Sequence, residues 1–185
     1  VRGRPVDLGE PVTLHASYRT PVQIDPFAIS LEQKTAVLLA ACAEMQAVPG
    51  IRVAEASVEI VRQDKTFAST EGSLIEQTII ETGCGLEATA VTEGEIQRRS
   101  YPNSVGRHQA TEGWEFVVRW DLAGNARQVA EEAAALLSAK PCPSDLTTII
   151  LDGSQLALQV HESCGHPIEL DRVMGMEADY AGTSF

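Results

Sequence analysis

The stretch AEASVEI, residues 54–60, decides the fold class of this 185-residue chain. Apolar and polar side chains alternate along it, so that alanine, valine and isoleucine fall on one face and glutamate and serine on the other. An alternation of period two is typical of a β-strand with one buried face and one solvent-exposed face. The stretch therefore predicts a strand in a sheet that is covered on one side.

Further strands are predicted on both sides of this stretch. Residues 63–65 (QDK) are predicted to form a hairpin turn that returns through 66–70, and Glu93-Gly94 a second tight turn. The stretch 114–120 places two tryptophans on one face, which we interpret as core packing rather than as the lining of a peptide groove. The other predicted strands span 12–16, 74–82, 86–91, 95–101 and 147–151, with loops in the rest of 1–29.

Helices are predicted from capping residues and apolar periodicity. The first begins at Ser30, which forms a capping-box pattern with Gln33 and precedes apolar residues of helical spacing. The second follows an Asn125 cap, and the third follows Asp152, a residue that commonly caps a helix. The predicted helices run from 30 to the Pro-Gly pair at 49–50, from 125 to 140, and from 152 onward.

The order of these elements predicts an α+β fold, with an antiparallel or mixed sheet and helices packed on it. We expect an N-terminal α+β domain over residues 1–143. Residues 144–185 are expected to hold a strand, a helix and the start of a catalytic region. The chain begins at Val1 rather than methionine and stops at Phe185, so we expect the N-terminal part of a longer two-domain protein.

Charge and cysteine usage restrict the partners and the compartment. The chain has 14 basic and 26 acidic residues, a net charge of -12, which opposes binding to nucleic acid or to an anionic membrane. No signal peptide and no apolar run of about 20 residues is present in the sequence. We therefore expect a cytoplasmic protein with reduced thiols at its four scattered cysteines, Cys42, Cys84, Cys142 and Cys164.

The motif HESCGH, residues 161–166, contains the candidate metal ligands and the candidate general base. Neutral imidazoles of His161 and His166 are suitable ligands for zinc. Glu162 follows His161 directly, which makes it a candidate general base toward a zinc-bound water rather than a ligand. The motif therefore predicts a zinc-dependent hydrolase of peptide bonds.

The two histidines lie five residues apart, a spacing that an ideal α-helix does not accommodate. At about 100° per residue the two side chains would be separated by about 140° around the helix. Gly165 and Pro167 offer unusual backbone conformations near His166, and a π-bulge is an alternative way to align positions five apart. We favour a helix with His161 and Glu162 in its last turn and His166 on an irregular exit.

Other residues near the motif have weaker assignments. Glu169 and Asp171 are candidates for hydrogen bonding to the distal nitrogens of the histidine ligands. Cys164 is interpreted as a packing residue rather than a thiolate ligand. A catalytic zinc usually has three protein ligands, so a third must come from elsewhere. His15 and His108 are candidates within this chain, although each is more simply interpreted as a surface histidine.

At these residues the chain resembles the TldD/PmbA metalloprotease family, whose members were once described as modulators of DNA gyrase. The resemblance continues through residues 151–153 (LDG) and 182–184 (GTS) and, more loosely, along the whole chain. The family pattern H-E-x-x-G-H-x-x-E-x-D is matched by His161, Glu162, Gly165, His166, Glu169 and Asp171.

The resemblance implies a soluble zinc peptidase that acts on unfolded or short peptides. It implies two similar subunits around the active site, as a homodimer or as a heterodimer with a paralogous subunit. His161 and His166 would be zinc ligands and Glu162 the catalytic base. The third ligand would be a cysteine of a C-terminal domain, so this chain alone is expected to show little activity and poor metal retention.

The alternative is a non-enzymatic peptide-binding or partner subunit, whose sheet accepts an extended peptide as an added strand. The histidines would then be structural or idle, and Glu162 would have no role as a base. Arg98 and Arg99 could clamp a peptide carboxylate, but we interpret them as a solvated strand face. A nucleic-acid-binding role has no support, because the sequence contains no basic stripe.

Overall fold

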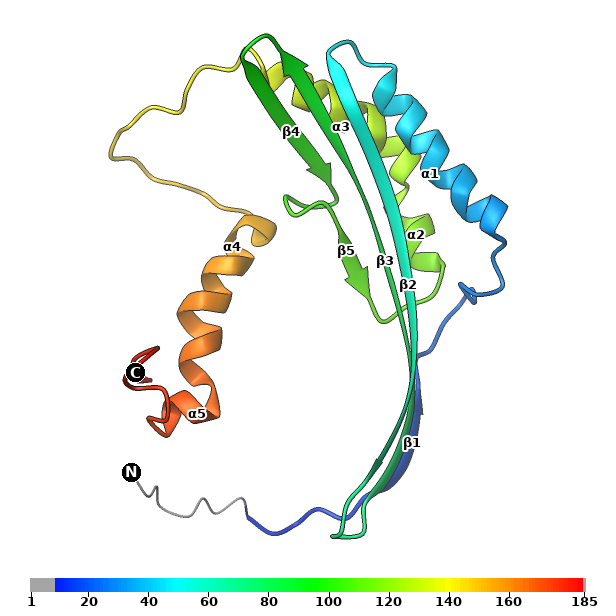
Figure 1. The fold of residues 1–185 in the computed structure, drawn as a ribbon, viewed down its shortest axis with the longest axis vertical. Helices are drawn as coiled ribbons and strands as arrows, with labels where there is room; N and C mark the ends of the chain where they lie inside the picture. Colours follow the sequence, from blue (N-terminus) through cyan, green and yellow to red (C-terminus); the bar gives the residue numbers. More distant parts are fainter. Residues whose placement is uncertain (1–8, 185) are drawn as a thin grey trace. The chain divides into compact units, whose positions relative to one another are not determined.

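A computed structural model describes residues 9–184 and confirms the α+β fold, with a mixed sheet and helices packed on it (Figure 1). The predicted loops at 1–8 lie outside the described residues. The strands are β1 (His15–Arg19), β2 (Ile51–Ala68), β3 (Leu74–Thr92), β4 (Glu95–Tyr101) and β5 (His108–Ala110). The helices are α1 (Leu31–Gln46), α2 (Glu115–Trp120), α3 (Leu122–Leu136), α4 (Gly153–Val160) and α5 (Leu170–Val173), with a π-helix (His161–Gly165) and a 3-10 helix (His166–Ile168).

Strand β3 is the centre of the sheet. It pairs antiparallel with β2 along almost its whole length. Its other edge pairs in turn with β1, β5 and β4, of which only β1 is parallel to it. The sheet is therefore mixed, and one long strand organises all of its neighbours.

The hairpin between β2 and β3 differs from the prediction. Strand β2 continues through residues 63–65, where the Asp64 carboxylate accepts hydrogen bonds from Arg62 and from Thr78 of β3. The turn comes later, near Gly72, whose φ of +97° favours glycine. The sequence QDK contains no glycine, the residue that adopts positive φ most readily, and the Asp64 side chain is hydrogen-bonded to Thr78 across the ladder instead.

Three other strand predictions were wrong in their bounds. The predicted strands at 74–82 and 86–91 are the single strand β3, because Gly83 and Gly85 lie inside the sheet. The predicted strand at 12–16 is shifted to β1, His15–Arg19. The strand at 95–101 and its turn at Glu93-Gly94 are confirmed as β4.

The core lies between one face of the sheet and helices α1, α2 and α3 (Figure 1). On α1, the capping box predicted at Ser30 and Gln33 is present. Helix α3 carries alanines toward the sheet, and their small side chains allow a close approach. Buried residues of the core include Met45, Cys84, Leu86, Ala88, Ala90, Phe116, Leu122, Ala126, Ala130 and Ala133.

The predicted strand at 114–120 is wrong, because most of this stretch forms helix α2. Trp114 and Phe116 are buried as the alternation predicted, but Val117 is also buried and Val118 is 60% exposed. The pairs Trp114–Val117 and Phe116–Trp120 therefore have the spacing of a helical face. A short apolar run can fit the two-residue period of a strand or the 3.6-residue period of a helix. Here packing against β3 favours the helix.

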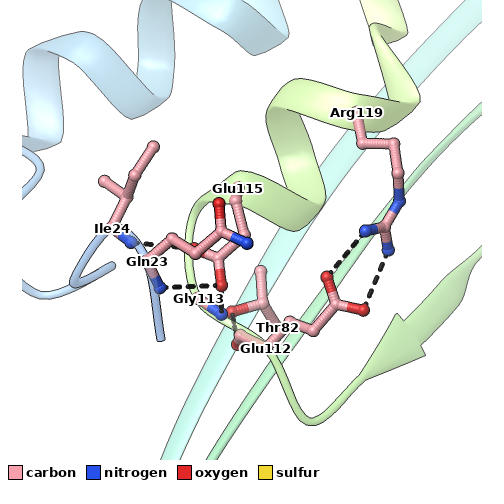
Figure 2. A network of polar contacts seen from close by, with 7 residues as sticks. All are labelled: Gln23, Ile24, Thr82, Glu112, Gly113, Glu115 and Arg119. Atoms are coloured by element: carbon pink, nitrogen blue, oxygen red, sulfur yellow. Dashed lines mark hydrogen bonds and ion pairs between the residues drawn. The ribbon is translucent and has the colours of Figure 1, made fainter. Parts of the chain in front are cut away.

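A polar network fixes the start of α2 (Figure 2). The Glu115 carboxylate accepts hydrogen bonds from the backbone N–H groups of Gln23, Ile24 and Gly113, at 3.1, 2.9 and 2.9 Å. Burial alone would raise the pKa of Glu115, but these donors outweigh it and lower the pKa. One side chain thereby ties the segment before α1 to the start of α2.

Predictions after α2 were wrong in two places. Helix α3 begins at Leu122 under an Asp121 cap, and Asn125 lies inside it and donates to the carbonyl groups of Trp120 and Asp121. No strand forms at 147–151. An apolar run becomes a strand only when a neighbouring strand pairs with it, and the described part of the chain supplies none for this segment.

The chain divides into two compact units. The first unit is Val1–Ser138 and contains the sheet, and the second unit is Ala139–Phe185 and contains the motif. Whether they fold as separate domains, with a boundary at 143, stays a prediction. Among the described residues, no helix has the length and apolar character needed to span a membrane.

Candidate metal centre

Helix α4 leads directly into the motif. Its predicted cap is present: the Asp152 carboxylate accepts from the backbone N–H of Gln155 at 2.9 Å and from the Ser154 hydroxyl at 2.8 Å. The hydrogen bond from Gln155, followed by that from Ser154, lowers the pKa of Asp152. The motif therefore begins directly after a capped helix of eight residues, at His161.

A π-helical turn resolves the five-residue spacing of the histidines. The backbone N–H of His166 donates to the carbonyl of His161, the hydrogen bond between positions five apart that defines a π-helix. The two ring centroids lie 4.5 Å apart with an interplanar angle of 84°. Both rings therefore point to one side of the chain.

The favoured route to this convergence was wrong, and the alternative π-bulge is the one observed. Gly165 has φ of -64° and ψ of -64°, and His166 has φ of -60° and ψ of -40°. Both conformations are right-handed helical, so no unusual dihedral is needed. Pro167 is accommodated in the first turn of the 3-10 helix, where its missing N–H has no cost.

Glu162 lies beside both rings. Its carboxylate oxygens are 3.9 Å from Nε2 of His161 and 3.8 Å from Nε2 of His166. Ligand atoms of the three side chains all lie within 4.8 Å of one another. The side chains are 59%, 60% and 40% exposed for His161, Glu162 and His166, so solvent reaches the group.

Glu169 holds the far side of His166. Its Oε1 lies 2.9 Å from Nδ1 of His166, within hydrogen-bond distance. This hydrogen bond, together with the negative charge of Glu169, raises the pKa of His166. A proton held on Nδ1 leaves Nε2 of the neutral ring as a free electron pair on the side of Glu162.

Asp171 contacts a different partner. Its Oδ1 accepts from the backbone N–H of Arg172 at 2.8 Å, and no contact with a histidine of the described chain is present. Ligand atoms of Glu169, Asp171 and Glu177 lie within 4.8 Å of one another. Sequence reasoning missed Glu177, since only the turn after α5 brings it near, and nothing in its spacing indicates that turn.

The other predicted candidates lie outside this group. His15 is exposed on β1, and His108 is exposed on β5 with its ring against Phe116 and Trp120. Neither belongs to a metal-ligating group of the described residues. Cys164 is exposed and is not part of the group either.

The arginine pair of β4 has partners within the chain. Arg98 lies 3.7 Å from Glu87. Arg99 donates from Nε and Nη2 to Oε2 of Glu132 on α3, at 2.9 and 2.7 Å. These contacts agree with a solvated face and tie β4 to α3.

The donor set fits a divalent metal ion. Two imidazole nitrogens and one carboxylate oxygen match the ligands that zinc accepts. The carboxylate hydrogen-bonded to His166 is the usual second partner of a metal-ligating histidine. The residues present therefore could hold a metal, with His161 and His166 as donors and a further ligand still required.

Comparison with known proteins identifies the family of this α+β chain. Residues 24–140 match the family model of the PmbA/TldA metallopeptidase central domain. The matched region ends before His161, so it supports the resemblance independently of the motif. The chain belongs to the PmbA/TldD family, and its first unit contains the family's central domain.

Relatives in three archaea are named metalloproteases. One from Methanothermobacter thermautotrophicus is 31% identical over 69% of this chain and 27% of its own length. One from Methanocaldococcus jannaschii is 26% identical over 85% of this chain and 33% of its own length. One from Archaeoglobus fulgidus is 26% identical over 89% and 36%. The chain thus spans about a third of the length of these relatives.

Proposed function

We propose that the full-length protein is a zinc-dependent peptidase of the HExxxH type that hydrolyses unfolded or short peptides in the cytoplasm. The observation that carries the proposal is the π-helical turn, which directs His161 and His166 to one side with Glu162 between them. Family membership and the names of the relatives support peptidase chemistry. Their greater length supports a site completed by residues outside this chain.

Each motif residue has a distinct role in this proposal. His161 and His166 hold the metal through Nε2, and Glu169 keeps the proton of His166 on Nδ1. A bound zinc ion would polarise the scissile carbonyl and make water more acidic. Glu162 accepts the proton of the attacking water and returns it to the leaving amine. Asp171 supports the turn after Glu169 rather than a histidine.

The test separates metal binding from proton transfer in the full-length protein. Glu162→Gln removes the base but keeps both imidazoles, so we expect bound zinc near the wild-type level and peptide turnover reduced by about 10²–10⁴-fold. His166→Ala removes a ligand, so we expect loss of both zinc and turnover. Zinc is measured by atomic absorption after dialysis, and turnover with an unfolded casein substrate.

Two matched controls lie on exposed positions of the first unit. Glu131→Gln and His15→Ala make the same chemical changes away from the motif, and both should leave zinc and turnover unchanged. Full turnover in Glu162→Gln would refute Glu162 as the base. Peptide binding without any cleavage by the wild type would instead favour the non-enzymatic alternative.

A further inference from the structure

The sheet has a pocket on the face that the helices leave open. Helices α1, α2 and α3 cover one face (Figure 1). Ala54, Ala56 and Val58 of β2 pack against that core, so the side chains between them point to the opposite face. The pocket on this opposite face has a volume of about 380 Å³, within the range of about 300–1,000 Å³ that is usual for small-ligand sites. Its lining includes Glu55, Ser57, Glu87, Val105 and Arg107, all of the first unit.

The loop between β4 and β5 forms one wall of this pocket. It lies directly over Gly85, where a Cβ would come within 2.8 Å of Cα of Arg107. Asn103 holds the loop from within: its Oδ1 accepts from the backbone N–H of Val105 at 3.1 Å, and its Nδ2 donates to the carbonyl of Arg107 at 2.9 Å. The wall of the pocket is therefore held in place by the chain's own contacts, without a ligand.

Two carboxylates of the pocket face each other across the sheet. Glu55 and Glu87 are directly opposed in the ladder between β2 and β3. Like charges in directly opposed positions destabilise a sheet. Glu55 forms no hydrogen bond or ion pair with a described residue. Glu87 has Arg98, whose Nη1 lies 3.7 Å from Oε1, beyond hydrogen-bond distance. The pair therefore has one loosely held cation for two negative charges.

Arg107 does not supply the missing positive charge. Its guanidinium donates to the carboxylate of Glu59, with which it forms an ion pair. This contact ties the loop to β2 and matches the charge of Arg107 with that of Glu59. The charge of Glu55 is left without a counterion in the described part of the chain.

The side chains of the pocket suit a primary ammonium group. Such a group has three N–H donors and no acceptor. The pocket offers three acceptor side chains, the carboxylates of Glu55 and Glu87 and the hydroxyl of Ser57. Val105 is 81% exposed and adds an apolar surface against which a carbon chain can lie. A calcium ion fits less well, because it takes about six to eight oxygen ligands.

We propose that this pocket binds a primary alkylammonium group, carried by a lysine side chain of a peptide or by a free linear amine. The bound cation would offset the repulsion between Glu55 and Glu87. The net charge of -12 favours the approach of cations to the chain. This site is separate from the proposed peptidase chemistry and requires no metal.

Calorimetric titration of the full-length protein tests the proposal. EDTA in the buffer removes metal, so cleavage does not interfere and the result does not depend on the metal centre. The two probes are a capped alanine pentapeptide with a central lysine and cadaverine, a linear diamine. We expect saturable binding at low ionic strength, and the relative affinities of the probes distinguish a site for lysine side chains from a site for free amines.

Variants of the two carboxylates should weaken this binding. Glu55→Gln and Glu87→Gln each remove one charge with little change in shape, so each should raise the Kd by about three- to tenfold. The double variant should show no detectable binding. Acetylation of the peptide's lysine removes the positive charge but keeps the carbon chain, so the acetylated peptide should not bind to the wild type.

The matched control is Glu131→Gln, the same chemical change at an exposed position of α3, which should leave the Kd unchanged. Circular dichroism confirms that each variant remains folded. A folded wild type that binds neither amine would overturn the proposal. Binding that survives the double variant would also overturn it, since the cation would then lie elsewhere.

Discussion

The two units of this chain are stabilised in different ways. The first unit has a continuous buried core between the sheet and three helices. In the second unit, none of the described residues from 139 to 184 is buried. Most of its hydrogen bonds are local, such as the Asp152 cap and the contact between Glu169 and His166, and one from the Ser184 hydroxyl to the carbonyl of Pro167, at 2.6 Å, joins residues 17 apart. The candidate metal centre therefore lies in the unit whose described residues include no buried one.

This difference explains how the motif keeps its geometry. The π-helical turn needs only contacts between positions five apart, and Glu169 is three residues from the ring that it holds. Short-range contacts of this kind do not require long-range packing. They do leave Leu158 and Val160 of α4 exposed, at 68% and 49%.

The contrast between the two units is tested most strongly by replacing one large apolar residue in each unit with alanine. Phe116 is 1% exposed in the core, so Phe116→Ala should reduce the free energy of unfolding by about 3–5 kcal/mol. Leu158→Ala should change it by less than about 0.5 kcal/mol in the 185-residue chain. Urea unfolding followed by circular dichroism measures both. An equal loss from Leu158→Ala would mean that α4 is covered and that the contrast is false.

Gly85 tests how tightly the first unit is packed. A Cβ at this position would come within 2.8 Å of Cα of Arg107 and closer still to the carbonyl oxygen of Gly106. Backbone cannot yield as a flexible side chain can, so Gly85→Ala should cost about 1–3 kcal/mol in urea unfolding. Gly83→Ala is the matched control, since a Cβ there would come no closer than 3.2 Å, to Cβ of Gln109, so a small shift is enough to accept it. Similar losses for both would show that the loop at 106–107 is free to move.

The contribution of Glu115 to the stability of the first unit should depend on pH. Its folded-state pKa lies below the ordinary value of 4.5, so its contribution to stability is present above about pH 4.5 and is lost as the pH falls through the folded pKa. Glu115→Gln keeps one acceptor and should cost about 1–2 kcal/mol at pH 7. The difference between the variant and the wild type should shrink below pH 4.5. A difference that stays constant down to pH 3 would contradict this role of the carboxylate.

Much of the fold was predictable because local signals agreed with packing. The alternation at 54–60 lies in β2, and the Ser30 and Asp152 caps begin helices as expected. The prediction for 114–120 failed because the apolar residues of this stretch fit both a strand and a helix, and only packing against β3 decides between them. The run at 147–151 failed because a strand also requires a partner.

The candidate site was also predictable in part: its chemistry follows from local sequence signals, but its exact geometry does not. The residue types of the motif indicate metal chemistry, and the awkward five-residue spacing indicates an irregular turn. The π-helix itself was only one of the two predicted routes, and the other was wrong because Gly165 and His166, the residue before Pro167, both have ordinary helical dihedrals. The contact between Glu169 and His166 depends on the 3-10 helix between them, which no residue pattern specifies.

The Asp152 cap gives the smallest effect and tests the local character of the second unit. Asp152→Ala removes the acceptor for the backbone N–H of Gln155, at a cost of about 1 kcal/mol to the helix. Because no core restrains α4 in the described unit, the loss should appear as fraying: faster amide hydrogen exchange at Gln155 and Leu156, with urea unfolding of the first unit unchanged. Asp152→Asn keeps a capping oxygen and should exchange nearly as slowly as the wild type. Unchanged exchange in Asp152→Ala would mean that α4 is held by more than its own hydrogen bonds, and that the contrast between the two units is smaller than their burial indicates.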